Sequence, residues 1–154
     1  MNLLIVFHAI AGAFGFMTFM WIAIELLILS RINKQSIDRI QILSVLGLVA
    51  LLGSWIMGGY YYVTVYGPNV KPLVKEEAEW VHSIGMEVKE HLFLFLPFLA
   101  FLEVFLIKNY SNRIEEVRRT LLIIAVTIVL FGFMMEFVGA LISNAARAAL
   151  EAKV

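Results

Sequence analysis

The chain has 154 residues, of which 62% are hydrophobic, and its mean hydropathy is +0.90. An ordinary soluble domain is about 45–50% apolar, so the composition excludes a soluble globular protein. The 12 Lys and Arg residues balance the 12 Asp and Glu residues, and a chain without basic excess is a poor partner for nucleic acid. Because the chain has no Cys, any metal or cofactor would depend on His, carboxylate, Met or Tyr side chains.

Four apolar stretches predict an all-α fold, a bundle of four transmembrane helices that forms a single membrane domain over residues 1–154. The predicted spans are about residues 3–29, 42–66, 84–107 and 120–146. Each exceeds the ~20 apolar residues that a helix needs to cross a bilayer. Gly67-Pro68-Asn69 predicts the end of the second span. We expect an integral protein of the cytoplasmic membrane of a bacterium or archaeon.

The distribution of Lys and Arg between the predicted loops indicates the orientation in the membrane. The loops after the first and third spans hold seven of these residues: Arg31, Lys34, Arg39, Lys108, Arg113, Arg118 and Arg119. The opposite side holds four, namely Lys71, Lys75, Arg147 and Lys153. Since basic loops stay in the cytoplasm, the bias predicts that both termini lie outside.

Two histidines in different spans have the spacing of a haem site. A rise of 1.5 Å per residue places His8 ~8 Å and His91 ~10 Å below the same outer surface. Two imidazoles at one depth can hold a b-type haem between helices, each Nε2 reaching the iron from one face. Gly12 follows one turn below His8, where it could admit the porphyrin. The alternative is that both histidines are hydrogen-bonded residues without a cofactor.

The third histidine cannot belong to that axial pair. His82 precedes His91 by nine residues, which places the two on opposite faces of an ideal helix. His82 could ligate a second metal near the surface or bind haem propionates as a cation. It could also be an interfacial histidine beside Trp80, without a ligand.

A carboxylate near His91 suggests a second type of metal site. Glu87 stands four residues before His91 and therefore shares its helix face. Its carboxylate could orient the imidazole, as groups next to metal-bound histidines usually do. Glu87 could equally be a ligand itself, in a metal site built from His8, Glu87 and His91. Met134 and Met135 could be ligands for copper(I), which is a further alternative.

Three glutamates within the spans are candidates for proton transfer. Glu25 and Glu103 lie near the inner ends of the first and third spans, where they could deliver protons to a quinone or cofactor pocket. Alternatively they pair with Arg31 and Lys108 or reach toward the headgroups. Glu136 lies too deep to reach water, so it needs a partner such as Lys89, a protonated state or a water-filled cavity. Quinone chemistry would use such a carboxyl as a proton donor or acceptor.

Two segments resemble a loose group of small membrane proteins. The segment Phe7-His8-Ala9-Ile10-Ala11-Gly12, followed by Phe16 and Trp21, resembles the first helix of the copper-resistance D domain and of HemJ-type protoporphyrinogen oxidase. Trp80-Val81-His82 with Lys89 and His91 is similar to the start of that group's third helix. The resemblance implies a four-helix fold and a haem-ligand role for His8. Leu29-Ser30-Arg31 stands where the group has leucine-proline-arginine, so protoporphyrinogen oxidation is not implied.

Three functions remain as hypotheses. The leading one is a membrane cytochrome b, in which haem passes electrons between the quinone pool and a redox partner, as a subunit or relay. Lys71–Glu79 would then be the docking surface for another membrane or periplasmic redox subunit. The others are a copper-handling or other metal-handling protein and a cofactor-free accessory subunit of a larger membrane complex. Enzymatic activity and a homo-oligomeric state are left open.

Overall fold

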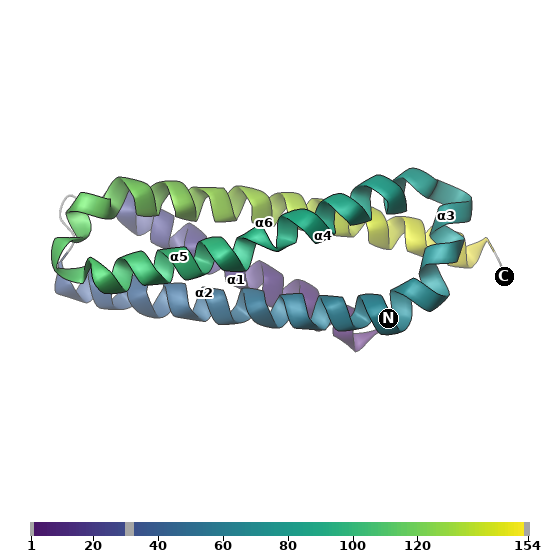
Figure 1. Cartoon of the computed structure of the whole chain (residues 1–154), viewed down its shortest axis with the longest axis horizontal. Helices are drawn as coiled ribbons and strands as arrows, with labels where there is room; N and C mark the ends of the chain where they lie inside the picture. The colour runs from purple at the N-terminus through teal and green to yellow at the C-terminus, as the bar shows by residue number, and fades with distance from the viewer. Residues whose placement is uncertain (1, 30–32, 153–154) are drawn as a thin grey trace.

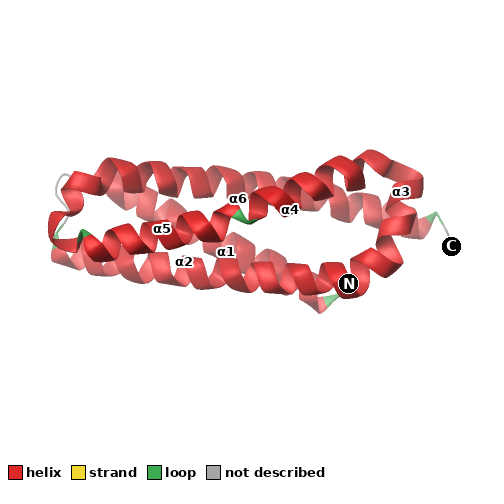
Figure 2. Cartoon of the chain, in the orientation of Figure 1, coloured by secondary structure: helices red, strands yellow, loops and turns green. Residues whose placement is uncertain are grey.

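The computed structural model describes residues 2–29 and 33–152. Nearly all of these residues are helical and none of them forms a strand (Figure 2), which confirms the all-α prediction. The long helices lie side by side in an elongated bundle (Figure 1). Both ends of the chain lie toward the end of the bundle that carries residues 71–80, which we call the α3 end.

The first two helices begin at asparagine side-chain caps. In chain order they are α1 (Leu3–Ile28), α2 (Lys34–Tyr61), η1 (Tyr62–Val70), α3 (Lys71–Trp80), η2 (Val81–Met86), α4 (Glu87–Phe93), α5 (Phe95–Asn109), η3 (Ser111–Arg113) and α6 (Ile114–Glu151). The Asn2 side chain accepts the N–H of Leu4 at 3.0 Å, which begins α1. The Asn33 side chain likewise accepts the N–H of Ser36 at 2.9 Å and begins α2.

The structure confirms the prediction of four separate spans only in part. By length and composition, three helical stretches are able to cross a membrane: Leu3–Ile28, Lys34–Asn109 and Ser111–Glu151. The middle stretch has 76 residues, because Gly67-Pro68-Asn69 does not end the helix as predicted. Pro68 instead lies within the π-helix η1, whose wider turn tolerates a missing N–H. The stretch reverses direction at the α3 end, so that α5 packs against α2 (Figure 1). Lys71–Glu79 therefore belongs to helix α3 rather than to a loop.

The bundle is a closed ring of helices. α1 packs against α2 and α6, and α5 packs against the same two helices. Phe19, Ile22 and Leu51 are fully buried in the core between them. Glycines allow the helices to approach closely. A Cβ atom on Gly47 would lie 2.2 Å from Thr18 Oγ1, and one on Gly132 would lie 2.5 Å from Cγ of Phe16.

This close packing predicts a difference between two glycines of α2. Gly47→Ala should lower the stability of the bundle by about 1–3 kcal/mol, the usual cost of overpacking a core. Gly53→Ala is the matched control, because a Cβ atom on Gly53 would meet nothing within 4 Å. Thermal unfolding of both variants in the same detergent measures the difference. Equal melting temperatures would contradict the packing of α2 against α1.

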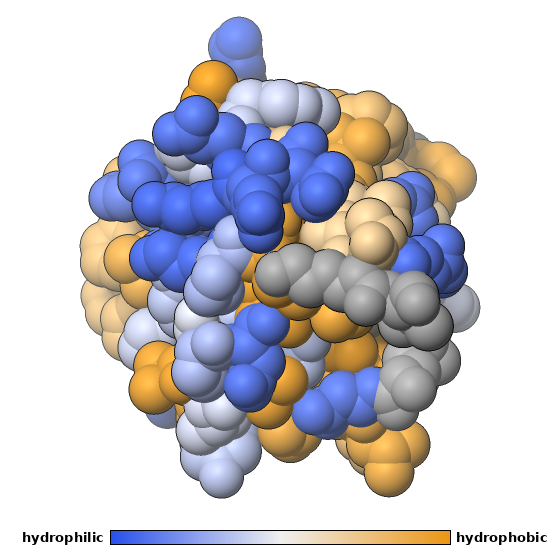
Figure 3. Space-filling model, turned by 90° about the vertical axis from the view of Figure 1, so that its right-hand side faces the viewer, coloured by the Kyte–Doolittle hydropathy of each residue, from blue (hydrophilic) through white to orange (hydrophobic). Residues whose placement is uncertain are grey.

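The surface of the bundle is apolar along its sides and polar at the α3 end. Large apolar side chains such as Ile28, Phe98 and Phe137 are 74%, 67% and 66% exposed. Seen from the α3 end, hydrophilic side chains cover much of the face, and hydrophobic side chains gather around its edge (Figure 3). A soluble monomer rarely exposes so much apolar surface. The exterior is therefore compatible with an integral membrane protein.

Candidate functional site

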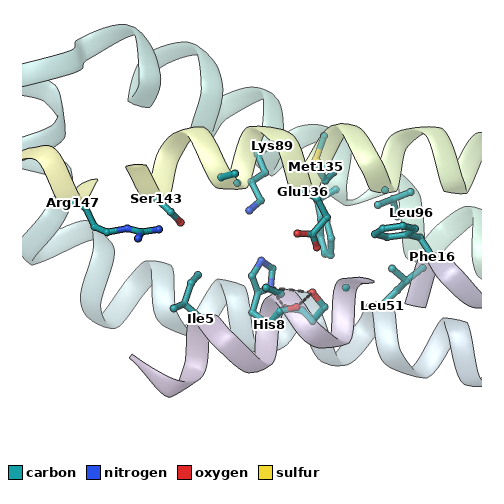
Figure 4. Close-up of a pocket in the computed structure, with 17 residues that line it drawn as sticks. Ile5, His8, Phe16, Leu51, Lys89, Leu96, Met135, Glu136, Ser143 and Arg147 are labelled. Carbon is teal, nitrogen blue, oxygen red and sulfur yellow. Dashed lines mark hydrogen bonds between the residues drawn. The ribbon is translucent and has the colours of Figure 1, made fainter. Parts of the chain in front are cut away.

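Two adjoining pockets, together called the cavity, lie between α1, α2, α4 and α6 in the half of the bundle nearer the α3 end. Its two parts have volumes of about 220 Å³ and 410 Å³. They share the lining residues Ile5, His8, Lys89, Phe93, Gly139 and Ser143. Small-molecule sites commonly have volumes of about 300–1,000 Å³, so the larger part alone is large enough for a ligand. Figure 4 shows the side chains of the smaller part.

His8 enters the cavity with a defined orientation. Its Nδ1 lies 2.8 Å from the carbonyl oxygen of Ser54 and 3.0 Å from the Ser54 hydroxyl. Because a carbonyl oxygen only accepts hydrogen bonds, Nδ1 carries the hydrogen, and Nε2 of the neutral ring is an acceptor. The Ser54 hydroxyl donates to the backbone oxygen of His8 at 2.9 Å, which adds a further hydrogen bond between α1 and α2. The imidazole points toward Lys89 across the cavity (Figure 4).

The glycines around His8 shape this part of the cavity. A Cβ atom on Gly58 would lie 2.7 Å from both Cε1 and Nδ1 of His8, so only glycine leaves room for the ring. On the other side, the ring of Phe93 lies 6.2 Å from the imidazole. Gly12, one turn along α1 from His8, also lines the smaller part of the cavity.

Two oppositely charged side chains complete the polar part of the lining. Nζ of Lys89 lies 2.9 Å from the position that a Cβ atom on Gly139 would take. Oε1 of Glu136 lies 3.5 Å from the equivalent position at Gly12. Within residues 2–29 and 33–152, no hydrogen bond or ion pair joins Lys89 to Glu136. The ammonium, the carboxyl and the imidazole of His8 therefore surround a common space (Figure 4).

The structure does not bring His91 next to His8. His91 and Glu87 are exposed, and neither lines the cavity. The inward face of α4 carries Lys89 and Phe93 instead, and Phe93 is about 200° around the helix from His91. The Nδ1–H of His91 bonds the backbone oxygen of Glu87 at 2.7 Å, not its carboxylate. The axial pair and the three-residue metal site are thus not assembled.

Metal ligands do not cluster elsewhere in the described part of the chain. Among those residues, no group of three or more His, Asp or Glu side chains could hold a metal ion. Met135 lines the smaller part of the cavity, whereas Met134 does not. The two side chains therefore do not point into the same cavity, as the ligands of one copper ion would.

His82 is buried away from the cavity. It keeps 5% of its surface accessible, whereas the neighbouring Trp80 is 58% exposed. Its Nδ1 lies 3.3 Å from the hydroxyl of Tyr66, a residue that is 2% exposed. Tyr66 itself lines the larger part of the cavity.

Glu25 and Glu103 lie toward the opposite end of the bundle and line no part of the cavity. Glu25 forms an ion pair with Arg39 and accepts the indole N–H of Trp21 at 2.8 Å. Its predicted partner Arg31 lies outside the described residues. Glu103 is fully buried, and neither carboxyl oxygen has a hydrogen-bond partner, so the predicted pairing with Lys108 is wrong.

Sequence reasoning missed two residues of the site. Ser54 fixes the orientation of His8, and Tyr66 connects the cavity to His82. The sequence offers a reason to single out Ser54, because it is a hydroxyl residue near Gly53 and Gly58 in an apolar span. Tyr66 offered none, since it follows other tyrosines in an apparent headgroup belt.

Comparison with protein-family models, with curated proteins and with solved structures found no match to this chain. The resemblance to the copper-resistance D and HemJ-type group therefore stays a prediction. Function has to be argued from the cavity and its side chains.

Proposed function

We propose that the chain is a four-pass integral membrane protein that binds a membrane quinone or its quinol beside His8 and exchanges its electrons with a redox partner. The four passes would be α1, α2, α4 with α5, and α6. Basic residues such as Lys34, Arg39 and Arg113 gather at the end opposite α3, which would face the cytoplasm of a bacterium or archaeon. Both termini and the cavity would then lie on the outer side.

The observation that carries this proposal is the convergence of three different polar groups on a largely apolar cavity. Nε2 of His8 accepts hydrogen bonds, the ammonium of Lys89 donates them, and the carboxyl of Glu136 accepts when ionised. A quinone carbonyl needs a donor and a quinol hydroxyl needs an acceptor. Reduction of a quinone also takes up two protons with two electrons, and groups of this kind exchange such protons.

The apolar part of the cavity suits the rest of such a molecule. Trp55, Val63 and Leu94 line the larger part and are 46%, 72% and 52% exposed on the sides of the bundle. An apolar tail could therefore reach the bilayer while the polar ring stays near His8 and Lys89. A ligand without an apolar tail would leave these exposed apolar side chains uncovered.

A b-type haem is the second candidate, favoured by the orientation of His8. Histidines that bind metals usually donate their other N–H to a carboxylate or carbonyl, as His8 does to Ser54. When bound, haem would supply one-electron transfer between the quinone pool and a partner. Nε2 of His8 would hold the iron, and Lys89 and Arg147 would offer cations to the propionates. The fit is partial, because no second histidine lines the cavity.

Titration of the purified protein with a decyl-tailed ubiquinone analogue tests the proposal. Trp55 lines the cavity, so we expect saturable quenching of its fluorescence. Lys89→Met should weaken binding about 10- to 100-fold, because a hydrogen bond from a charged group contributes about 1.5–3 kcal/mol. Lys75→Met on α3 is the matched control, since Lys75 does not line the cavity.

Two outcomes would redirect the assignment. Quenching that never saturates, or that is equal in Lys89→Met and wild type, would contradict a quinone site in this cavity. A b-type absorption spectrum in the purified protein, together with absent quinone binding, would instead establish the haem candidate.

A further inference from the structure

Two polar side chains are buried in an otherwise apolar cluster at the α3 end. The core of this cluster is Val70, Val74, Val81 and Ile142, together with Tyr66. Tyr66 and His82 are 2% and 5% exposed, and the distance from the hydroxyl to Nδ1 is 3.3 Å. A strong hydrogen bond from a hydroxyl is about 2.5–3.0 Å long, so this one gives little stability. Apolar residues could fill the same space without the cost of burying polar groups.

The pair connects the cavity with the α3 end. Tyr66 lines the larger part of the cavity, and its ring stacks on that of Tyr62 at 5.5 Å. His82 belongs to η2 and lines no part of the cavity. Lys71 and Lys75 on α3 and Glu87 and Glu90 on α4 interact electrostatically with His82.

We propose that Tyr66 and His82 form the route by which a proton leaves the cavity for the outer face when bound quinol is oxidised. This inference rests on the proposed function. Both groups can donate and accept, which a proton route requires. Lys89, Glu136 and His8 contact the ring of the ligand in our proposal, whereas Tyr66 and His82 would carry the proton onward.

A hydroxyl of the quinol gives its proton through one water to the oxygen of Tyr66, while the Tyr66 hydroxyl proton passes to Nδ1 of His82. His82 then releases the proton on Nε2 to water at the α3 end, and its ring reorients before the next passage. Full oxidation releases two protons and gives two electrons, one at a time, to a one-electron redox partner.

Stopped-flow oxidation of quinol-loaded protein by ferricyanide tests the route. Two ferricyanide ions take the two electrons, and a pH-indicator dye follows the two protons. We expect Tyr66→Phe to slow oxidation at least about 10-fold, because a positioned proton-transfer group contributes about 10²–10⁴-fold to a rate. The affinity for the decyl-tailed quinol should stay unchanged. We also expect D₂O to slow oxidation by the wild-type protein, because the route transfers exchangeable protons.

Three controls separate the alternatives. Tyr60→Phe should behave as wild type, because Tyr60 is 59% exposed and lines no part of the cavity. His82→Gln should slow oxidation as much as Tyr66→Phe, and the double variant should be no slower, since both act on one route. Glu90→Gln examines a competing path, because Glu90 lines the cavity and is exposed.

Unchanged rates in Tyr66→Phe and His82→Gln would overturn the route, as would slowing in Glu90→Gln alone. Lost quinol affinity in Tyr66→Phe would make Tyr66 a binding residue and overturn it as well. Failure of the wild-type chain to bind quinol is a separate result, which would remove the proposed function itself.

Discussion

His8→Ala is expected to weaken ligand binding in the cavity, whereas His91→Ala is expected to leave it intact. His8 lines both parts of the cavity and turns an unprotonated Nε2 toward it. His91 is exposed and bonds only its own helix backbone. We expect His8→Ala to weaken binding of the quinone analogue at least about 10-fold, the effect of about 1.4 kcal/mol. If the ligand is haem, the b-type spectrum should disappear in His8→Ala alone.

The two histidine variants form a matched pair, because each removes one imidazole from the same half of the bundle. Thermal unfolding shows whether His8→Ala still folds, since it also breaks the contact with Ser54. Ser54→Ala provides a milder test, because it keeps the carbonyl that orients the ring. Loss of the spectrum or of binding in both His8→Ala and His91→Ala would restore the paired ligands that the sequence predicted. Retention in both would exclude His8 from the site.

The contrast between His8 and His91 shows what sequence can establish about a helical bundle. A constant rise per residue converts position into depth, and the apolar stretches predicted α1 to within one residue. Helix α6 begins six residues before the predicted span and ends five residues after it. Depth does not say which face of a helix turns inward. That depends on packing against the neighbouring helices, and in α4 the inward face carries Lys89 and Phe93. His8 and His91 are therefore expected at a similar depth, but His8 faces the cavity and His91 does not.

The sequence also does not predict which side chains pair between different helices. Glu25 was expected to pair with a basic residue just after its own helix, yet its partner Arg39 lies one turn inside α2. The side chain of Arg118 crosses from α6 to the end of α1 and donates to the carbonyl of Leu26 at 2.6 Å and 2.9 Å. Such contacts depend on how α1, α2 and α6 are rotated in the ring. Local spacing carries no information about that rotation.

Replacing Glu103 by Leu is expected to stabilise the protein without changing ligand affinity. Glu103 is fully buried, and both carboxyl oxygens lack a hydrogen-bond partner. An unpartnered ionised carboxylate would be prohibitively costly there, so we infer that Glu103 is a neutral acid in the folded bundle. Removing a buried polar group without a partner should recover about 1–3 kcal/mol. Thermal unfolding in detergent measures the gain.

Glu103 differs from Glu136 in its expected effect on ligand binding. Glu103 lines no part of the cavity, so Glu103→Leu should bind the quinone analogue with the wild-type affinity. Glu116→Leu is the control for removing an exposed acid, because Glu116 pairs with Arg113 at the surface. Infrared spectra should show a protonated carboxyl band that is lost in Glu103→Gln. A destabilised Glu103→Leu with weakened binding would contradict the argument, because Glu103 would then have a partner connected to the site.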